Sequence, residues 1–290
     1  MRSRNTSDYI TLFFKGIFMG IADAMPGISG GTIALLLGIY EELIESISEL
    51  KISLFSKLIN KGFKSFWEKL NGNFLLVLVS GIGISLISFV KISASFLESF
   101  PLFIWSFFLG LIFATVYVIY KLINQWHNLN FFFLIISIIF SIFLSSFSAY
   151  DTDEISLLYI LFSGIIASSA MILPGISGSL ILVILGVYAY LIKALDNLEL
   201  IVIFTFISGA IIGLLGFSKI LKYLFNNHRD ATYTIMLGLV IGSIENVWPW
   251  NKSFSTELSN LNLFLSISLV ILGFVIVILL EKNKKRLNER

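Results

Sequence analysis

Two short stretches of the sequence combine proline, glycine and hydroxyl side chains within strongly apolar surroundings. The first reads Pro26-Gly-Ile-Ser-Gly-Gly-Thr32, three residues after Asp23, and the second reads Pro174-Gly-Ile-Ser-Gly-Ser179. Proline cannot continue the hydrogen-bond ladder of a preceding helix, and glycine permits unusual backbone angles and close approach of a ligand. A serine or threonine can then cap a new helix, whose first N–H groups and dipole attract an anion such as phosphate. The chemistry predicted for both stretches is anion binding at a break in a helix.

The residues of these breaks divide into three predicted roles. The candidate substrate-binding residues are Ser29, Gly30, Gly31, Thr32, Ser177, Gly178, Ser179 and Lys15. The helix breaks are assigned to Pro26, Gly27, Pro174 and Gly175, and the candidates for coupling or gating are Asp23 and Glu41. An ionisable residue inside a membrane segment is costly and is by default a functional hypothesis.

Each assignment has a purely structural alternative. Each break could be a tight helix-packing turn of small residues. Asp23 could carry a coupling proton, pair with Lys15 or cap the nearby glycine amides. Lys15 could meet a phosphate or extend its ammonium group to the membrane surface, and Glu41 could be a solvated carboxylate.

The composition is that of a membrane protein. Hydrophobic residues make up 57% of the 290 residues and charged residues 13%, whereas a soluble domain has about 25% charged residues. The apolar runs, such as 131–147, are continuous and do not alternate as barrel strands do. The predicted fold class is therefore an all-α polytopic membrane protein. The chain has no cysteine and only two histidines, His127 and His228, in polar connections, so we expect no metal site, and we expect no cofactor.

The sequence repeats itself. With a shift of 148 residues, Gly16–Tyr40 aligns with Gly164–Tyr188, and the two proline-containing stretches coincide. Further along the shift is 128, so that Ser80-Gly81 aligns with Ser208-Gly209. We predict a first repeat at 1–148 and a second at 149–290, which together form one transmembrane domain. The change of shift places an insertion at 50–73, whose apolar residues and interleaved lysines predict an amphipathic helix on a membrane surface or a solvated loop helix.

Each repeat contains two short apolar segments around its break and then three longer ones. The short pairs are expected at 10–23 with 32–46 and at 157–172 with 180–194, and the longer segments at 74–90, 102–121, 131–148, 200–217, 232–247 and 263–280. A spanning helix needs ~20 residues, so a short pair predicts a re-entrant hairpin or broken helices. In either case each repeat crosses the membrane an odd number of times, which predicts inverted topology.

The distribution of basic residues predicts the orientation. With the N- and C-termini in the cytoplasm, all of the 20 lysines and arginines except Lys91, Lys193 and Lys252 lie on the cytoplasmic side. Such an excess of positive charge is typical of cytoplasmic loops. Inverted repeats with interrupted helices are a transporter architecture, in which the substrate site usually lies near the membrane midplane.

The paired motifs resemble those of the polyprenyl-phosphate (undecaprenyl-phosphate) translocase family PopT, formerly a family of unknown function. The resemblance rests on Gly16, Gly20 and Asp23 before the first Pro-Gly-Ile-Ser-Gly-Gly-Thr, on Gly38-Ile-Tyr40-Glu41 after it, and on the second motif with Leu185-Gly-Val-Tyr188. It covers essentially the whole chain. It implies a flippase of the bacterial cytoplasmic (inner) membrane that returns undecaprenyl phosphate to the cytoplasmic leaflet, where this lipid carrier serves peptidoglycan and other cell-envelope polymers. The second motif departs from the first, since Leu180 stands where Thr32 would repeat.

Two other functions fit parts of the pattern. Membrane polyprenyl-diphosphate phosphatases also have inverted repeats and a similar motif, but neither break here contains the arginine that would clamp a phosphate transition state. A small-anion transporter or channel could also use helix N-termini. We expect a transporter and not an enzyme, with polyprenyl phosphate and membrane lipids as partners and no nucleic acid. An oligomer is compatible with the sequence.

Overall fold

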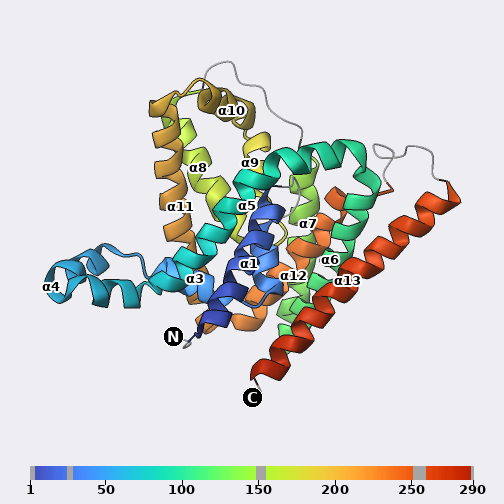
Figure 1. The fold of residues 1–290 in the computed structure, drawn as a ribbon, viewed down its shortest axis with the longest axis horizontal. Helices are drawn as coiled ribbons and strands as arrows, with labels where there is room; N and C mark the ends of the chain where they lie inside the picture. Colours follow the sequence, from blue (N-terminus) through green and yellow to red (C-terminus); the bar gives the residue numbers. More distant parts are fainter. Residues whose placement is uncertain (1–3, 25–28, 148–154, 251–258, 289–290) are drawn as a thin grey trace.

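The computed structural model describes residues 4–24, 29–147, 155–250 and 259–288, and the described part is helical without strands (Figure 1). In the first half the helices are α1 (Thr6–Asp23), α2 (Gly30–Leu36), α3 (Tyr40–Ser48), α4 (Ile52–Lys69), α5 (Gly72–Ser99), α6 (Pro101–Leu122) and α7 (Asn128–Ser145). In the second half they are α8 (Leu157–Ile172), α9 (Gly178–Ile184), α10 (Tyr188–Asp196), α11 (Leu200–Asn227), α12 (Arg229–Gly242) with the 3-10 helix η1 (Ser243–Val247), and α13 (Asn260–Asn288).

The second arm of each predicted hairpin is broken once more. We expected single segments at 32–46 and 180–194, and this is wrong, because Gly38 and Gly186 have φ of 66° and 70°. In that left-handed conformation the chain leaves the helix and turns, which is a common way for a helix to end. The turn separates α2 from α3 and α9 from α10, and the axes of α9 and α10 differ by 104°.

The two halves share their pattern of helix packing. α1 packs along α5 and α8 packs along α11, while α6 and α7 pair with α13 and α12. A Cβ atom on Gly16 or Gly81 would lie 2.3 Å from a backbone oxygen across the α1–α5 contact. The aligned Gly164 and Gly209 have the same crowding across α8–α11, at 2.6 and 2.1 Å. Small residues therefore let both helix pairs approach closely, as in other membrane proteins.

One packing position shows a reciprocal exchange between the halves. A Cβ on Gly20 of α1 would lie 2.1 Å from the Ser85 hydroxyl of α5. At the aligned positions the serine is Ser168 on α8 and the glycine is Gly213 on α11, with a corresponding separation of 2.4 Å. Each contact thus combines one glycine with one serine, on opposite helices in the two halves.

Four helices are long and apolar enough to cross a membrane in the described part of the chain, namely α6, α7, α11 and residues Asn260–Leu279 of α13. The number rises to six if two bent pairs each count as one span. One pair is α9 with α10, and the other joins the end of α4 to α5. The short helices α2 and α9 have seven residues each, about 10 Å of helix.

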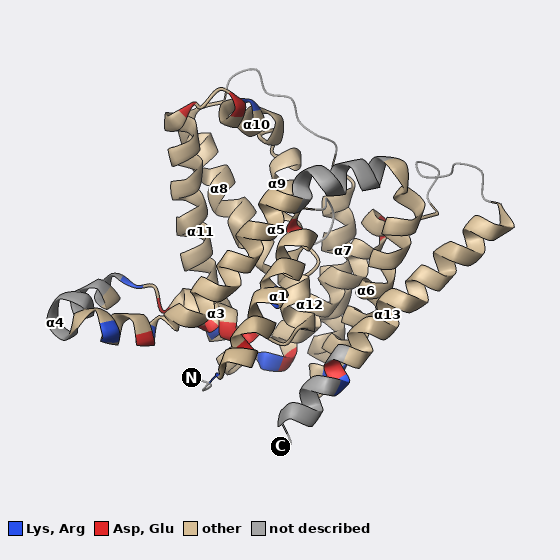
Figure 2. Cartoon of the chain, in the orientation of Figure 1, with Lys and Arg blue, Asp and Glu red and all other residues tan. Residues whose placement is uncertain are grey.

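Charged residues gather at one end of the bundle (Figure 2). The N-terminus lies there near α3, and the C-terminus lies at the same end at the foot of α13, whereas α10 lies at the opposite end (Figure 1). Helix α4 projects sideways near the charged end and is interrupted at Gly62, which has φ of 78°. Beyond that kink the rings of Phe63 and Trp67 stack with centroids 5.5 Å apart, and Phe63 is 63% exposed. The insertion at 50–73 is therefore helical, with apolar side chains on its surface.

Candidate functional site

The first break places two polar side chains at the start of α2. Ser29 is the N-cap of α2, and its hydroxyl accepts a hydrogen bond from the Gly31 N–H at 3.1 Å. The Gly30 N–H donates to Asp23 Oδ1 at 2.6 Å, so the last residue of α1 also caps α2. The carboxylate lies against Gly30, where a Cβ would be 2.3 Å from Asp23 Oδ2. A carboxyl group of the protein itself therefore occupies the N-terminus of this helix.

The two breaks meet each other in the centre of the bundle. Ser29 Oγ donates to the Met171 carbonyl at 2.9 Å, and Tyr40 OH donates to the Ile172 carbonyl at 3.0 Å. The last carbonyls of a helix lack partners within it, and here the first half supplies those partners to α8. In the reverse direction the Gly175 N–H donates to Thr32 Oγ1 at 3.1 Å. The contact is so close that a Cβ on Gly31 would be 2.5 Å from the Ile172 oxygen.

The second break is more open than the first. Ser177 is buried and precedes α9, but its hydroxyl pairs with that of Ser179 at 2.8 Å, and no described side chain caps α9. Pro174 is buried, and Gly175 has φ of 89° with the backbone of α12 against it. Gly178 and Ser179 are partly exposed. At the position aligned with Asp23 the second half has Met171, which has no acceptor for a cap.

Pro26 and Gly27, which we predict as helix-breaking residues, lie outside the described residues, so the first break is described from its two flanks only. On those flanks the structure brings together Asp23, Ser29, Gly30 and Thr32 with the second motif. These are the site residues that the sequence grouped. Most of their polar atoms are engaged in contacts within and between the two breaks.

Lys15 and Glu41 lie elsewhere. The Lys15 ammonium donates to the Leu37 carbonyl at 2.8 Å, at the C-terminal end of α2 and not at the break. The second half has a corresponding hydrogen bond, in which Tyr159 OH donates to the Leu185 carbonyl at 2.8 Å. In both halves, then, the helix before the break hydrogen-bonds to the far end of the short helix. The observed contact of Lys15 is structural.

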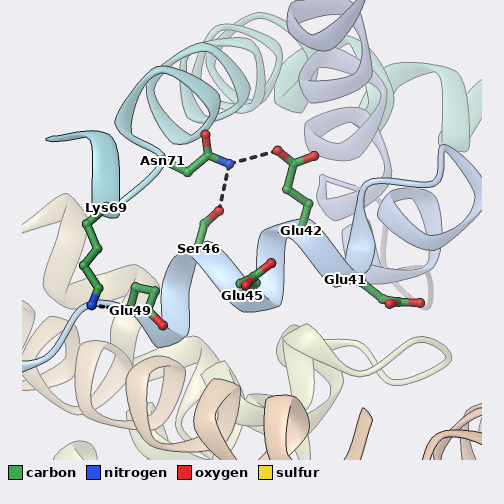
Figure 3. A pocket seen from close by; sticks show the side chains of 7 residues that line it. All are labelled: Glu41, Glu42, Glu45, Ser46, Glu49, Lys69 and Asn71. Carbon is green, nitrogen blue, oxygen red and sulfur yellow. Dashed lines mark hydrogen bonds and ion pairs between the residues drawn. The ribbon is translucent and has the colours of Figure 1, made fainter. Parts of the chain in front are cut away.

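Glu41 belongs to a cluster of carboxylates on α3 and at its C-terminal end. The sequence pattern alone does not predict this cluster. Glu41, Glu42, Glu45 and Glu49 line a cavity of about 510 Å³ with Ser46, Lys69 and Asn71 (Figure 3). Asn71 donates to Glu42 at 2.8 Å and to Ser46 at 3.3 Å. In Figure 3 the Glu41 side chain points away from Asn71, toward another part of the protein.

The basic partners of α3 come from distant parts of the chain. Arg4 donates to Glu42 at 2.7 Å, and Arg229 donates to Glu41 at 2.7 Å. The Tyr233 hydroxyl also donates to Glu41. Lys222 donates to Glu49 at 2.7 Å. The partners of Glu41 and Glu49 lie more than 170 residues away in the chain. Pairs so far apart leave no signal in a single sequence, so Glu41 was predicted without its partners.

Two charged groups at this end have shifted pKa values. The hydrogen bond from Lys222 lowers the pKa of Glu49 below its ordinary value, and Lys51 and Lys69 add to the effect. The hydrogen bond to Glu42 raises the pKa of Arg4. Both shifts favour the charged forms, so this end of the bundle is held by ionised pairs at neutral pH.

Comparison with known proteins agrees with the motifs. The sequence profile of a family described as undecaprenyl phosphate translocase-like matches residues 19–265. The chain is 38% identical over 255 residues to a polyprenyl-phosphate transporter of Vibrio cholerae, a match that covers 88% of this chain and 82% of that one. It is 31% identical over 285 residues to a polyprenyl-phosphate transporter of Staphylococcus aureus, with 92% and 94% covered. No solved structure matches. The chain therefore belongs to the undecaprenyl phosphate translocase-like family.

Proposed function

We propose that the protein is a flippase that returns undecaprenyl phosphate across the bacterial cytoplasmic membrane for reuse in cell-envelope synthesis. The observation that carries the proposal is the direct contact between the two breaks, through Ser29, Thr32 and Gly175, in a chain similar to polyprenyl-phosphate transporters over most of its length. The phosphate head binds at the paired breaks while the greater part of the tail stays in lipid. Non-helical backbone within the membrane is expected only where protein groups or water in a cavity form hydrogen bonds with its N–H and C=O groups.

The proposed transport motion relies on two inverted repeats. The matched glycine packing of α1–α5 and α8–α11 supports a duplicated structural unit. The position of α3 at the charged end and of α10 at the opposite end (Figure 1) supports inversion. Rocking of one repeat against the other would expose the breaks to one leaflet and then to the other.

The orientation follows from charge. Arg4, Lys222 and Arg229 form ion pairs with Glu42, Glu49 and Glu41, and α3 lies at the end of the bundle where charged residues gather (Figure 2). Positive residues accumulate on the cytoplasmic side of membrane proteins. We place both termini, α3 and α4 on that side, so that α10 faces the outside.

Asp23 supplies a means of coupling. A phosphate that accepts a hydrogen bond from the Gly30 N–H competes with the Asp23 carboxylate, which occupies that donor at 2.6 Å. A phosphate and a carboxylate that share this donor would lie close together and repel strongly in a medium of low dielectric constant. A proton on Asp23 removes that repulsion and weakens its hydrogen bond to the amide, because a neutral carboxyl oxygen is a weaker acceptor than a carboxylate, so that binding of the head group is linked to proton uptake. We accordingly expect Asp23→Asn to bind the lipid but to respond little to a proton gradient.

The test is a leaflet assay with purified protein in liposomes that contain undecaprenyl phosphate, with and without a proton gradient. Wild-type protein should move the lipid, and Gly30→Leu and Ser177→Leu should abolish this movement. Gly83→Leu on α5 is the matched control, because a Cβ there meets nothing within 4 Å. Normal transport by both break variants would overturn the site assignment, and inactive wild-type protein would overturn the function.

The rival functions receive less support. The relatives from Vibrio cholerae and Staphylococcus aureus are described as transporters, which favours transport over phosphatase chemistry. Release of inorganic phosphate from undecaprenyl diphosphate by the purified protein would support an enzyme. Flux of chloride or phosphate through liposomes that lack polyprenyl lipid would support a small-anion transporter.

A further inference from the structure

An apolar groove opens beside the first break. It has a volume of about 280 Å³ and is formed by side chains of α1, α2, α6 and α13. Its wall is apolar throughout, and it includes Ala22, Ile33, Leu111 and Val277. The groove lies between two closely packed helix pairs, α1 with α5 and α6 with α13.

The groove has a closed end and a mouth. At the closed end Ala22, Ile33 and Val277 are 1%, 7% and 3% exposed. At the mouth Phe18 and Ile276 are 55% and 37% exposed. Both mouth residues are large and apolar, on helix surfaces that face the membrane in the proposed arrangement. The groove is therefore a lateral opening toward lipid and not a water-filled channel.

The closed end adjoins the residues of the break. Ala22 precedes Asp23, whose carboxylate accepts from the Gly30 N–H, and Ile33 follows Thr32, whose hydroxyl accepts from Gly175. An anionic head at the break and an apolar chain in the groove would thus lie beside neighbouring residues of α1 and α2. The volume lies near the lower limit of the ~300–1,000 Å³ of small-molecule pockets, so it holds a segment of a long chain and not the whole chain.

We propose that this groove binds the isoprenoid segment of the lipid next to its phosphate. The inference rests on the proposed function and deepens it. It names the part of the protein that distinguishes a polyprenyl phosphate from other lipid phosphates. A phosphate alone does not distinguish a polyprenyl phosphate from phosphatidic acid. An enclosed apolar wall beside the head-group position does. Within the bilayer the gain comes from van der Waals packing and not from leaving water, so a branched isoprenoid chain that fits the wall binds better than an acyl chain that does not.

Two substitutions fill the groove from different helices. Leu111→Trp on α6 places a larger side chain in the wall, and Ile276→Trp on α13 narrows the mouth. Ile276 is partly exposed, so its substitution leaves the packed interior in place if that of Leu111 disturbs folding. Phe113→Trp is the matched control, since Phe113 lies on α6 outside the groove and is 37% exposed.

The experiment measures binding of undecaprenyl phosphate to each purified variant in phosphatidylcholine nanodiscs, with the ligand-induced rise in Tm as a second readout. We expect both groove variants to bind about tenfold more weakly, with unchanged Tm in the absence of the lipid, and Phe113→Trp to bind as wild type does. Dioleoyl phosphatidic acid, which carries a phosphate on acyl chains, should compete poorly with undecaprenyl phosphate on the wild-type protein.

The possible failures are distinguishable. Wild-type affinity in both groove variants would overturn the groove assignment and leave the proposed function intact. Equal competition by phosphatidic acid would show that the groove accepts any chain and would overturn its selective role. Absence of undecaprenyl phosphate binding by wild-type protein would overturn this inference together with the proposed function.

Discussion

The hairpins α2–α3 and α9–α10 have the same lengths and the same glycine turn but different surroundings. All seven residues of α2 are buried, whereas in α9 only Ile181 is. Tyr40 at the start of α3 is buried and bonded to the second half, while the aligned Tyr188 is 42% exposed. Helix α3 packs on α11 of the other half, and the main contacts of α10 are with α9 and α11 of its own half.

The difference shows what a repeated sequence does and does not determine. Local structure is the same in both halves. Each short helix is followed by a glycine with positive φ, and a carbonyl at its C-terminal end accepts a hydrogen bond from the preceding helix. The contacts that the hairpins make with the other half do not repeat, because Met171, Ser179 and Leu180 stand at the positions aligned with Asp23, Gly31 and Thr32. The first hairpin is thus docked into the partner half and the second is not. In the rocking motion proposed above, the docked hairpin is the one that must be released to open that side.

The difference between the two hairpins is tested most strongly by exchanging the residues at one aligned position, Gly31 and Ser179. Gly31→Ser gives the first motif the residue of the second, but its Cβ would lie 2.5 Å from the Ile172 oxygen. We expect a loss of about 1–3 kcal/mol in stability, as for other overpacked sites, measured by thermal unfolding in detergent. Ser179→Gly is the counterpart at a partly exposed position and should lose less than about 1 kcal/mol. Equal losses in the two variants would contradict the asymmetry.

The capping serines provide the next test. Ser29→Ala removes a cap from α2 and a donor to the Met171 carbonyl, and should cost about 1–2 kcal/mol. Ser177→Ala removes only a hydroxyl pairing with Ser179 and should cost about 0.5 kcal/mol or less. Thermal unfolding compares the two directly. If Ser177→Ala proved the more harmful, the second break would be held by contacts that differ from those described.

The ion pairs of α3 can be weakened without disturbing the core. Glu41→Gln weakens the contacts to Arg229 and Tyr233, and a partly exposed pair is worth about 0.2–1 kcal/mol. Amide hydrogen exchange should accelerate in α3 and stay unchanged in α10. The substitution Arg229→Gln should have a similar effect on α3. Unchanged exchange in both variants would mean that burial alone holds α3 in place.

Much of the architecture was predictable from the sequence, and the reasons are local. Proline, glycine and serine at the two breaks mark helix ends, and continuous apolar runs mark helices. The stop at Gly38 was missed because the surrounding apolar residues continue the helical pattern. The partners of α3 were missed because Arg229 and Lys222 lie more than 170 residues from the carboxylates that they contact. No signal in a single sequence encodes that pairing, and the same is true of the groove formed by four separate helices.

The smallest expected effect is the pH dependence of the α3 contact with α11. Lys222 lowers the pKa of Glu49 in the folded protein, so the folded state favours the carboxylate more than the unfolded chain does. The resulting stability is present above the ordinary pKa of a glutamate and is lost as the pH falls through the lowered value. Thermal unfolding across this acidic range should therefore show a pH-dependent component that Glu49→Gln removes. Lys222→Met should remove the same component, and the double variant should lose no more than either single one, because both substitutions break one interaction. If the single variants instead lost separate, additive components, the pKa of Glu49 would be lowered mainly by Lys51 and Lys69, and Tyr40 and Glu41 would be the polar links between α3 and the other half.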